Sequence, residues 1–249
     1  MPNFSLLGGI EPFLHCQLRR GESIFCEANA MVMMEDNLDL QGTLQGGIMQ
    51  ALMRRFANDE SLFQQRIEAV RGDGDCLLAP TLDGDMMILD VGAVQYTLSD
   101  GAFVAGTSGM DVKAKIQTNL GGALFGDTGG FMVMQTQGAG QVVVSGFGSL
   151  FELQVEQGKP VTIDNGHVVC WDSNLQYSLS ASVNQNRGFI GNMINSVTSG
   201  EGMVLKFSGH GKVVLCSRNR DNYQGWLQSI LGTNSGGRSG GNGLFGGIL

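Results

Sequence analysis

The sequence predicts an all-β fold, and three observations support this prediction. Short apolar runs, broken by glycine or by Asp and Asn turns, recur roughly every ten residues, a spacing typical of β-sandwiches and barrels. Apolar and polar residues alternate within the runs; in "MVLKFSG", for example, Met203, Leu205 and Phe207 share one face. Glycine supplies 39 of the 249 residues, about twice its average share of ~7%, which favours many tight turns.

The expected strands are the apolar runs between these turns. They cover residues 13–18, 30–34, 38–43, 76–79, 86–89, 103–105, 112–116, 132–136, 141–145, 150–155, 168–171, 175–180, 203–208 and 212–217. A further hairpin is expected within residues 60–79, with its turn at 72–75.

Helix signals are few, and they predict one or two short helices. Ile48, Leu52 and Phe56 recur at i, i+4 and i+8 in "GGIMQALMRRFAND", which predicts a helix of two to three turns. The run "DNYQGWLQSILG" predicts a second helix, with Asp221 or Asn222 as its N-cap and Gly232 just past its end.

Three copies of one unit are expected along the chain. Residues 199–217 align with residues 128–145, and the segments upstream of both hairpins also align. We therefore expect a single β domain over residues 1–232, with repeats at about 13–80, 86–148 and 150–219. Glycine at matched positions predicts close packing between the repeats. The Gly/Ser-rich tail 233–249 is expected to be flexible, although its apolar end could dock on a neighbouring subunit or a membrane surface.

The charge of the chain makes nucleic acid an unfavourable partner. Fifteen Lys and Arg stand against 23 Asp and Glu, giving a net charge of -8, which opposes the neutralisation of phosphates. Arg54, Arg55 and Arg66 form a local exception, which is interpreted as a solvated helix face.

Nothing in the sequence predicts export or a membrane span. No run reaches the ~18 to 20 apolar residues that a spanning helix needs, and the start lacks the basic region of a signal peptide. The five cysteines are an odd number without a C-x-x-C pair, which predicts buried free thiols: Cys16, Cys26, Cys76, Cys170 and Cys216. A cytoplasmic protein is therefore expected.

A search for catalytic and binding motifs assigns no site residue. "GAGQVV" and "SGHGKVV" lack the remaining positions of nucleotide-binding loops, so the glycines are interpreted as turn and packing residues. His15, His167 and His210 have no metal-ligand spacing and are interpreted as surface turn histidines. No catalytic, cofactor-binding or metal-binding residue is therefore predicted, and no cofactor.

Two carboxylate pairs and several large apolar residues also have structural interpretations. Asp73 with Asp75 and Asp83 with Asp85 alternate with glycine, which favours turn chemistry over general acid and base catalysis. The methionines of "AMVMMED" are expected to fill a strand core, rather than to form an adaptable binding surface. The two tryptophans, Trp171 and Trp226, are expected to anchor a core or a seam.

Three quoted segments carry a resemblance to a known family. "EANAMVMMEDNLDLQ", "GGALFGDTGGFMVMQTQGAGQVVVSGFGSLFEL" and "GEGMVLKFSGHGKVVLCSRN", taken in order, resemble a bacterial and archaeal family with a fungal mitochondrial biogenesis relative, named for altered inheritance of mitochondria. The resemblance covers residues 4 to 219. It implies the fold of the tryptophan RNA-binding attenuation protein, a β-sandwich or double-stranded β-helix, and a scaffold role. It supplies no catalytic residues, and a shared fold does not transfer RNA binding.

The leading hypothesis for the function is a non-enzymatic scaffold that acts through self-assembly and contact with a protein or membrane surface. Apolar β units of this kind predict a homo-oligomer, for example a trimer, and an unknown protein partner. The alternative is a small-ligand module that binds a metabolite or lipid between repeats or subunits. An enzyme of unrecognised type is the third class.

Overall fold

The structure is a computed structural model that describes residues 1–42, 65–117, 131–181 and 203–231. Antiparallel strands dominate these residues and form four sheets, accompanied by one α-helix near the end of the described chain. The all-β fold class is therefore confirmed. The helix expected around residues 48–56 and the tail 233–249 lie outside the described residues.

The first part of the chain contributes one leading strand, β1 (Asn3–Leu7), and then six strands that we call block 1 (residues 13–78). These six are β2 (Phe13–Leu18), β3 (Ser23–Cys26), β4 (Met31–Met34), β5 (Leu38–Gly42), β6 (Gln65–Ala69) and β7 (Gly74–Leu78). The turn between β6 and β7 covers residues 70–73, so the turn expected at 72–75 lies too late in the sequence.

Block 2 (residues 84–147) and block 3 (residues 150–216) also contain six strands each. In block 2 they are β8 (Gly84–Val91), β9 (Tyr96–Ser99), β10 (Phe103–Thr107), β11 (Met110–Gln117), β12 (Phe131–Gly138) and β13 (Gly140–Phe147). In block 3 they are β14 (Leu150–Val155), β15 (Val161–Asp164), β16 (Val168–Asp172), β17 (Gln176–Ala181), β18 (Met203–Ser208) and β19 (Gly211–Cys216), with the short 3-10 turn η2 (Asn165–His167) before β16.

One order of strand pairing recurs in the three blocks. The first and third strands of each block pair with the sixth, and the second and fourth strands pair with the fifth. A register irregularity in the third strand also recurs at the same place, between Met31 and Met33, Phe103 and Ala105, and Val168 and Cys170. A β-bulge of this kind bends a strand and increases its twist.

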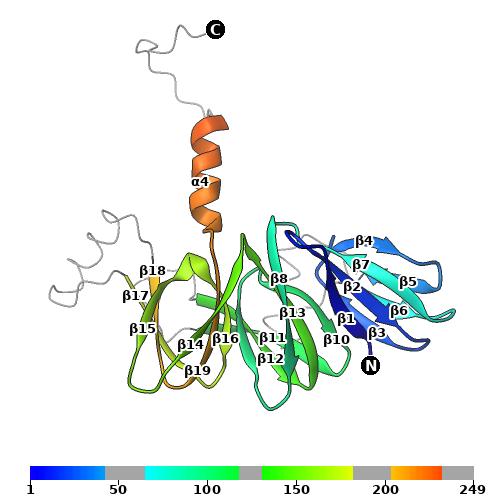
Figure 1. Cartoon of the computed structure of the whole chain (residues 1–249), viewed down its shortest axis with the longest axis horizontal. Coiled ribbons are helices and arrows are strands. Elements are labelled where there is room, and N and C mark those ends of the chain that lie inside the picture. The colour runs from blue at the N-terminus through cyan, green and yellow to red at the C-terminus, as the bar shows by residue number, and fades with distance from the viewer. Residues whose placement is uncertain (43–64, 118–130, 182–202, 232–249) are drawn as a thin grey trace, which may run out of the picture.

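Neighbouring blocks share sheets. β3 of block 1 pairs with β10 of block 2, and β9 of block 2 pairs with β16 of block 3. Each six-stranded sheet therefore takes three strands from one block and three from the next, in the orders β5-β6-β3-β10-β13-β8 and β11-β12-β9-β16-β19-β14. Figure 1 shows the blocks following one another along the molecule, with block 1 at the right.

Neighbouring blocks also share their buried apolar core. The first of three buried clusters joins block 1 side chains such as Leu14 and Ile67 to Val104 and Val143 of block 2. The second cluster joins block 2 to Val169 of block 3. The core of each described block is therefore completed by its neighbour, and each shared buried Val or Leu stabilises the fold by about 1.5–3 kcal/mol.

Close packing explains matched glycines at the start of the sixth strands. A Cβ placed on Gly74 would lie 2.9 Å from Leu38, one on Gly140 would lie 2.2 Å from Thr107, and one on Gly211 would lie 2.9 Å from Asp172. These contacts lie inside each block. The described seam between blocks 2 and 3 has its own close-packed glycine, Gly146, whose Cβ would lie 2.6–2.7 Å from Leu150, Val169 and Cys216.

Helix α4 (Arg220–Leu231) follows block 3 and projects from the sheets (Figure 1). The side chain of Asn219 accepts hydrogen bonds from the backbone N–H groups of Asp221 and Asn222 at 3.0 and 3.1 Å. Asn219 is therefore the N-cap, two or three residues before the expected positions, because its side chain reaches the free N–H groups of the first turn.

We predict that Gly146→Ala destabilises the protein by about 1–3 kcal/mol, because the added methyl group overlaps three packed side chains at the seam of blocks 2 and 3. Gly42→Ala is the matched control, since nothing lies within 4 Å of a Cβ there. Urea unfolding followed by circular dichroism measures both variants. Equal stability of the two variants would contradict a tightly packed seam.

Candidate functional site

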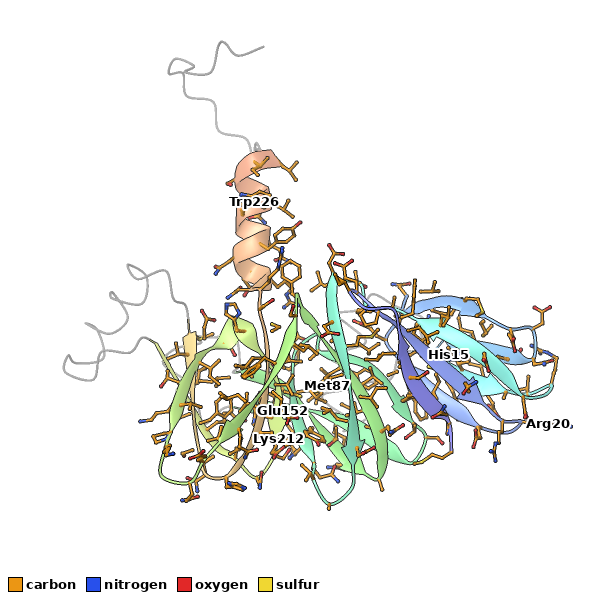
Figure 2. All side chains as sticks on the ribbon, viewed as in Figure 1. His15, Arg20, Met87, Glu152, Lys212 and Trp226 are labelled. Carbon is orange, nitrogen blue, oxygen red and sulfur yellow. The ribbon has the colours of Figure 1, made fainter. Side chains whose placement is uncertain are left out.

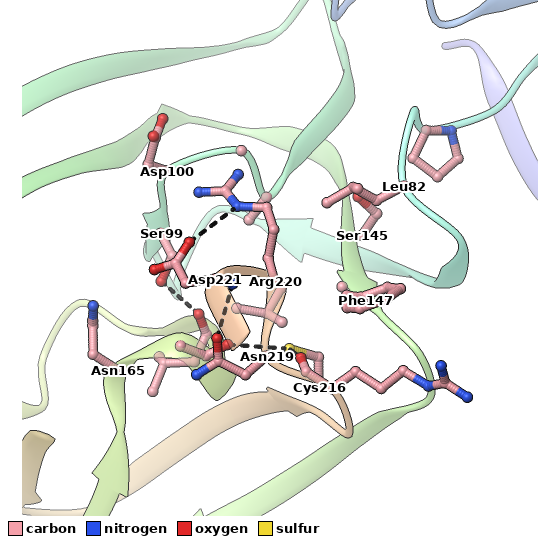
Figure 3. Close-up of a pocket in the computed structure, with 18 of the residues that line it drawn as sticks. Leu82, Ser99, Asp100, Ser145, Phe147, Asn165, Cys216, Asn219, Arg220 and Asp221 are labelled. Carbon is pink, nitrogen blue, oxygen red and sulfur yellow. Dashed lines mark hydrogen bonds and ion pairs between the residues drawn. The ribbon is translucent and has the colours of Figure 1, made fainter. Parts of the chain in front are cut away.

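A pocket of about 430 Å³ lies where the three blocks and the start of α4 meet. Block 1 contributes Glu27, block 2 contributes the turn at Asp100 and Gly101, and block 3 contributes η2 and the segment from Cys216 to Asp221. Figure 3 shows that these lining residues come from segments far apart in the sequence. The volume falls within the usual range of small-ligand sites.

Hydrogen bonds to Asp164 hold two lining residues of the pocket, Gly166 and Asn219, in place. One carboxylate oxygen of Asp164 accepts from the backbone N–H of Gly166 at 2.7 Å and from the amide of Asn219 at 3.4 Å. A Cβ on Gly166 would lie 2.1 Å from the Asn219 amide nitrogen, so the turn needs glycine at this position. Asn219 thus joins the turn of block 3 to the first turn of α4.

Charged groups of both signs line the pocket. Arg220 reaches over the backbone of Gly101, where its guanidinium lies 3.0 Å from the position of a Cβ. Burial, and then the charge of Asp100, raise the pKa of the half-buried Glu27 carboxyl above its ordinary value. The pocket therefore offers guanidinium donors beside carboxylates, a combination that suits a polar or zwitterionic ligand by hydrogen bonding.

A second pocket, of about 340 Å³, lies on the other side of Phe147. It is lined by Asp83, Asp85, Arg218 and Tyr223, among others. Asp85 accepts a hydrogen bond from the backbone N–H of Met86 at 2.8 Å. The Asp83 and Asp85 pair lies at a cavity, and the turn interpretation is wrong for Asp85, which lies within β8 opposite Gly146, whereas Asp83 precedes that strand.

The other carboxylate pair forms contacts within block 1. Asp73 accepts from the backbone N–H of Arg20 at 2.8 Å, and Asp75 lies 2.8 Å from Nε2 of His15. Figure 2 shows His15 on the sheet surface of block 1. His15 is therefore a strand residue, and the expectation that it lies in a surface turn is wrong.

The three histidines lie on separate elements. His15 is on β2, His167 is in η2, and His210 is in the turn before β19. Nδ1 of His167 donates to the carbonyl of Cys216 at 2.8 Å. In the part of the chain that the structure describes, no three His, Cys, Asp or Glu side chains are grouped as metal ligands.

All five cysteines are free and buried, which confirms the expectation of buried free thiols. Cys16 and Cys76 lie opposite each other on β2 and β7. The hydrogen bond between them, followed by burial, raises the pKa of Cys16. Burial raises the pKa of Cys26 to about 12. The raised pKa values disfavour the thiolate forms of Cys16 and Cys26, and a thiolate is what a nucleophilic cysteine needs.

The two tryptophans differ in their surroundings. Trp171 is 1% exposed and packs edge-on against Tyr177 and Phe207 at centroid distances of 4.9 and 5.4 Å, as expected for a core anchor. Trp226 is 55% exposed on α4, so the expectation that it anchors a core or seam is wrong (Figure 2). The expectation rested on residue type, because large aromatic side chains are usually buried, but α4 projects away from the sheets.

The methionine-rich strand β4 is only partly a core strand. Met31 and Met34 pack against the first buried cluster, whereas Val32 and Met33 are exposed. The bulge in β4 interrupts the alternation that the sequence suggested. Arg66 lies on β6 and pairs with Glu68 at 3.2 Å, so the helix-face interpretation is wrong for this residue, while Arg54 and Arg55 lie outside the described residues.

Sequence reasoning missed the residues that line the larger pocket. Glu27, Asp100 and Asn165 lie in or next to the turn between the second and third strand of each block, and Arg218 and Arg220 follow the last strand. The signal that could have found them is the equivalent position of the three turns in their blocks, combined with two arginines around the start of a helix.

Comparison with known proteins identifies relatives over most of the chain. The model of the family described as "Mitochondrial biogenesis AIM24" matches residues 4–218. An uncharacterized protein of Streptococcus pyogenes serotype M6 is 34% identical over 230 residues, which cover 90% of this chain and 88% of that protein. The crystal structure of a Streptococcus pyogenes protein, 31% identical, matches 92% of this chain and 100% of its own with a TM-score of 0.76.

Helix α4 is not a candidate for crossing a membrane. Among the described residues, no helix is both long enough and apolar enough to span a bilayer.

We predict that Glu27→Gln changes how stability depends on pH. The raised pKa means that the folded state binds the Glu27 proton more tightly than the unfolded chain does. This contribution to stability is complete below the ordinary Glu pKa of about 4.3, and it is lost as the pH rises through the higher folded-state value. Urea unfolding should therefore show a greater advantage of the variant over the wild type at pH 7 than at pH 4. Parallel pH profiles would contradict this prediction.

Proposed function

Because the chain belongs to the mitochondrial biogenesis AIM24 family, whose bacterial relatives described above carry no assigned activity, we propose a function from the surface of the molecule itself. The protein acts as a non-enzymatic scaffold, which assembles with copies of itself and docks on a partner surface through α4. The observation that carries this proposal is the uncovered apolar side of that helix.

Helix α4 presents its large apolar side chains to solvent. Trp226, Ile230 and Leu231 are 55%, 60% and 73% exposed, and no residue of the helix is buried. Trp226 and Ile230 are four residues apart and therefore lie on one face of the helix. Exposed apolar patches on a helix mark contact sites for other molecules, because water is released when they are covered.

The base of the helix is held in place. Beside the Asn219 cap, the ring of Tyr223 packs against Phe147 at 5.0 Å and stacks on Trp226 at 5.7 Å. The guanidinium carbon of Arg218 lies over the Phe147 ring, 5.6 Å from its centroid. A helix fixed at its first turn presents its apolar face with little loss of conformational freedom on binding, which favours affinity.

The chemistry of α4 favours a protein partner over a lipid surface. Beyond Arg220 and Asp221, its polar positions carry uncharged Asn, Gln and Ser side chains. Helices that lie on membranes normally have Lys or Arg on the polar face, where these residues contact anionic headgroups. The buried thiols and the net charge of -8 support a cytoplasmic setting away from nucleic acid.

We predict that Trp226→Ser combined with Ile230→Ser removes partner binding without unfolding the β body. Truncating a central aromatic anchor costs about 2 kcal/mol or more, which corresponds to roughly 30-fold weaker binding. Affinity capture from the native cells, with crosslinking and mass spectrometry, should recover partners with the wild type and with the polar control Gln228→Ser, but not with the double variant. Identical captured partners for all three chains would contradict docking through α4.

Sedimentation with phosphatidylcholine and phosphatidylglycerol vesicles tests the membrane alternative with the same variants. Trp226 is the exposed tryptophan of the described chain, so a blue shift of its emission on vesicles would overturn the choice of a protein partner. We expect no shift.

The 430 Å³ pocket favours a second candidate function, the binding of a small polar metabolite or lipid headgroup between the blocks. Glu27, Asp100 and Arg220 would give such a ligand charged partners of both signs.

We predict, for this alternative, that a ligand found by thermal-shift screening protects the wild type but not Arg220→Gln. At about 100 times its dissociation constant, a ligand adds roughly 2.7 kcal/mol of stability. The apo form of the variant should unfold at nearly the wild-type temperature, because Arg220 is a surface side chain. A broad metabolite and lipid library without any shift would favour the scaffold.

A further inference from the structure

The two described junctions between blocks follow one geometry. At each junction, the second strand of one block pairs antiparallel with the third strand of the next. Ala105 lies opposite Cys26 at the first junction, and Cys170 lies opposite Leu98 at the second. Since Ala105 and Cys170 occupy the same place after the bulge, the two registers are equivalent.

The same two strand positions are unpaired at the ends of the chain. In block 1 the third strand, β4, forms the edge of the sheet β1-β2-β7-β4. In block 3 the second strand, β15, forms the edge of the sheet β15-β18-β17. Within the described ranges, neither strand has a second partner. Figure 1 shows them at opposite ends of the molecule.

Strand β4 exposes a side chain at a position that is buried in the two internal junctions. Val32 is 52% exposed, whereas its counterparts Val104 and Val169 in the junction strands are 0% and 3% exposed. The sequence of β4, "MVMM", has none of the charges or prolines that protect a lone edge strand from pairing. An apolar edge of this kind is expected to be covered by another strand.

We propose that β4 of one copy of this chain pairs antiparallel with β15 of the next copy, so that copies join head to tail through the geometry of the internal junctions. The occupant of the β4 edge is therefore a second copy. This inference deepens the self-assembly part of the proposed function and rests on it. The joined sheet would have the order β1-β2-β7-β4 followed by β15-β18-β17, and so would contain both halves found in the complete sheets.

The internal registers give the register of the new junction. The pairs Ala105 with Cys26 and Cys170 with Leu98 correspond to Met33 with Ile163 of the next copy. The pairs Thr107 with Ile24 and Asp172 with Tyr96 correspond to Glu35 with Val161 of the next copy.

The residue before β15 does not block this pairing. At the internal junction, Ser173 donates its backbone N–H to the carbonyl of Gln95 at 2.7 Å. The counterpart of Gln95 is Pro160, which keeps the accepting carbonyl although it has no N–H group. The junction therefore loses one terminal hydrogen bond at most.

The two different edges allow a mixing experiment. Val32→Lys charges the β4 edge, and Thr162→Pro removes an outward N–H donor from the β15 edge. Light scattering on the wild type should give a multiple of the 26.5 kDa chain mass. Each variant alone should be a monomer, and an equimolar mixture should form a dimer, because one chain still offers β15 and the other still offers β4. Val94→Lys, an exposed valine away from both edges, should keep the wild-type mass.

Several outcomes would overturn the inference. Val32→Lys at the wild-type mass would show that β4 is not the interface, and Thr162→Pro that still forms dimers alone would indicate symmetric β4 pairing. Monomers in the mixture would equally exclude the head-to-tail junction. Far-ultraviolet circular dichroism of each variant confirms that it is folded, so that a failed mixture reports on pairing.

A disulfide tests the register. The Asp172 and Tyr96 pair lies between hydrogen-bonded pairs, so its counterparts Glu35 and Val161 of the next copy would have Cα atoms about 4.5–5 Å apart, suitable for a disulfide. The variant E35C/V161C should form ladders of linked chains on non-reducing gels. The mismatched variant E35C/T162C should not, because neighbouring residues face opposite sides. Ladders from both or from neither would overturn the register.

These measurements separate the inference from the scaffold proposal. A wild-type monomer would overturn both the junction and the self-assembly. A wild-type oligomer that Val32→Lys leaves intact would overturn the junction alone, and partner capture through α4 is scored independently with Trp226→Ser and Ile230→Ser.

Discussion

The pairing of one block's second strand with the next block's third strand is the constraint on which the molecule depends. A β-strand needs partners on both sides to satisfy its backbone groups, and the described blocks do not supply them alone. β3 and β9 obtain their second partners from the following block, and the buried clusters cross the same boundaries. The described fold is therefore a chain of shared sheets, and the pocket lies where these shared boundaries meet α4.

The sequence predicted the longer strands and the fold class, because glycine turns and alternating apolar residues act locally. It did not predict β3, β9 and β15, which have only four residues each and mix polar with apolar side chains. These strands exist because their partners order them, which is information that a short run does not contain. The hypothesis of three copies stays a prediction, with which the recurring order of pairing and the recurring bulge agree.

Less of the candidate sites could be predicted. The larger pocket collects Glu27, Asp100, Asn165 and Arg220 from three blocks, and ordinary turn residues of this kind carry no motif. The sequence also did not show that Trp226 is exposed, because an apolar stripe on a helix has the same sequence pattern whether a core or solvent faces it. By contrast, the buried thiols were predictable, since the cysteines are odd in number, lack a C-x-x-C pair and have apolar neighbours in the sequence.

Because α4 projects from the sheets, it stays outside the strand junction that would join copies into an array (Figure 1). In a head-to-tail array every junction repeats the same geometry, so every copy would carry its helix at an equivalent position along the array. An array that makes many weak contacts at once binds through avidity, and its overall affinity rises steeply with the number of helices engaged. Such an array would bind a surface with many closely spaced targets more tightly than a single target, even where each helix alone binds weakly.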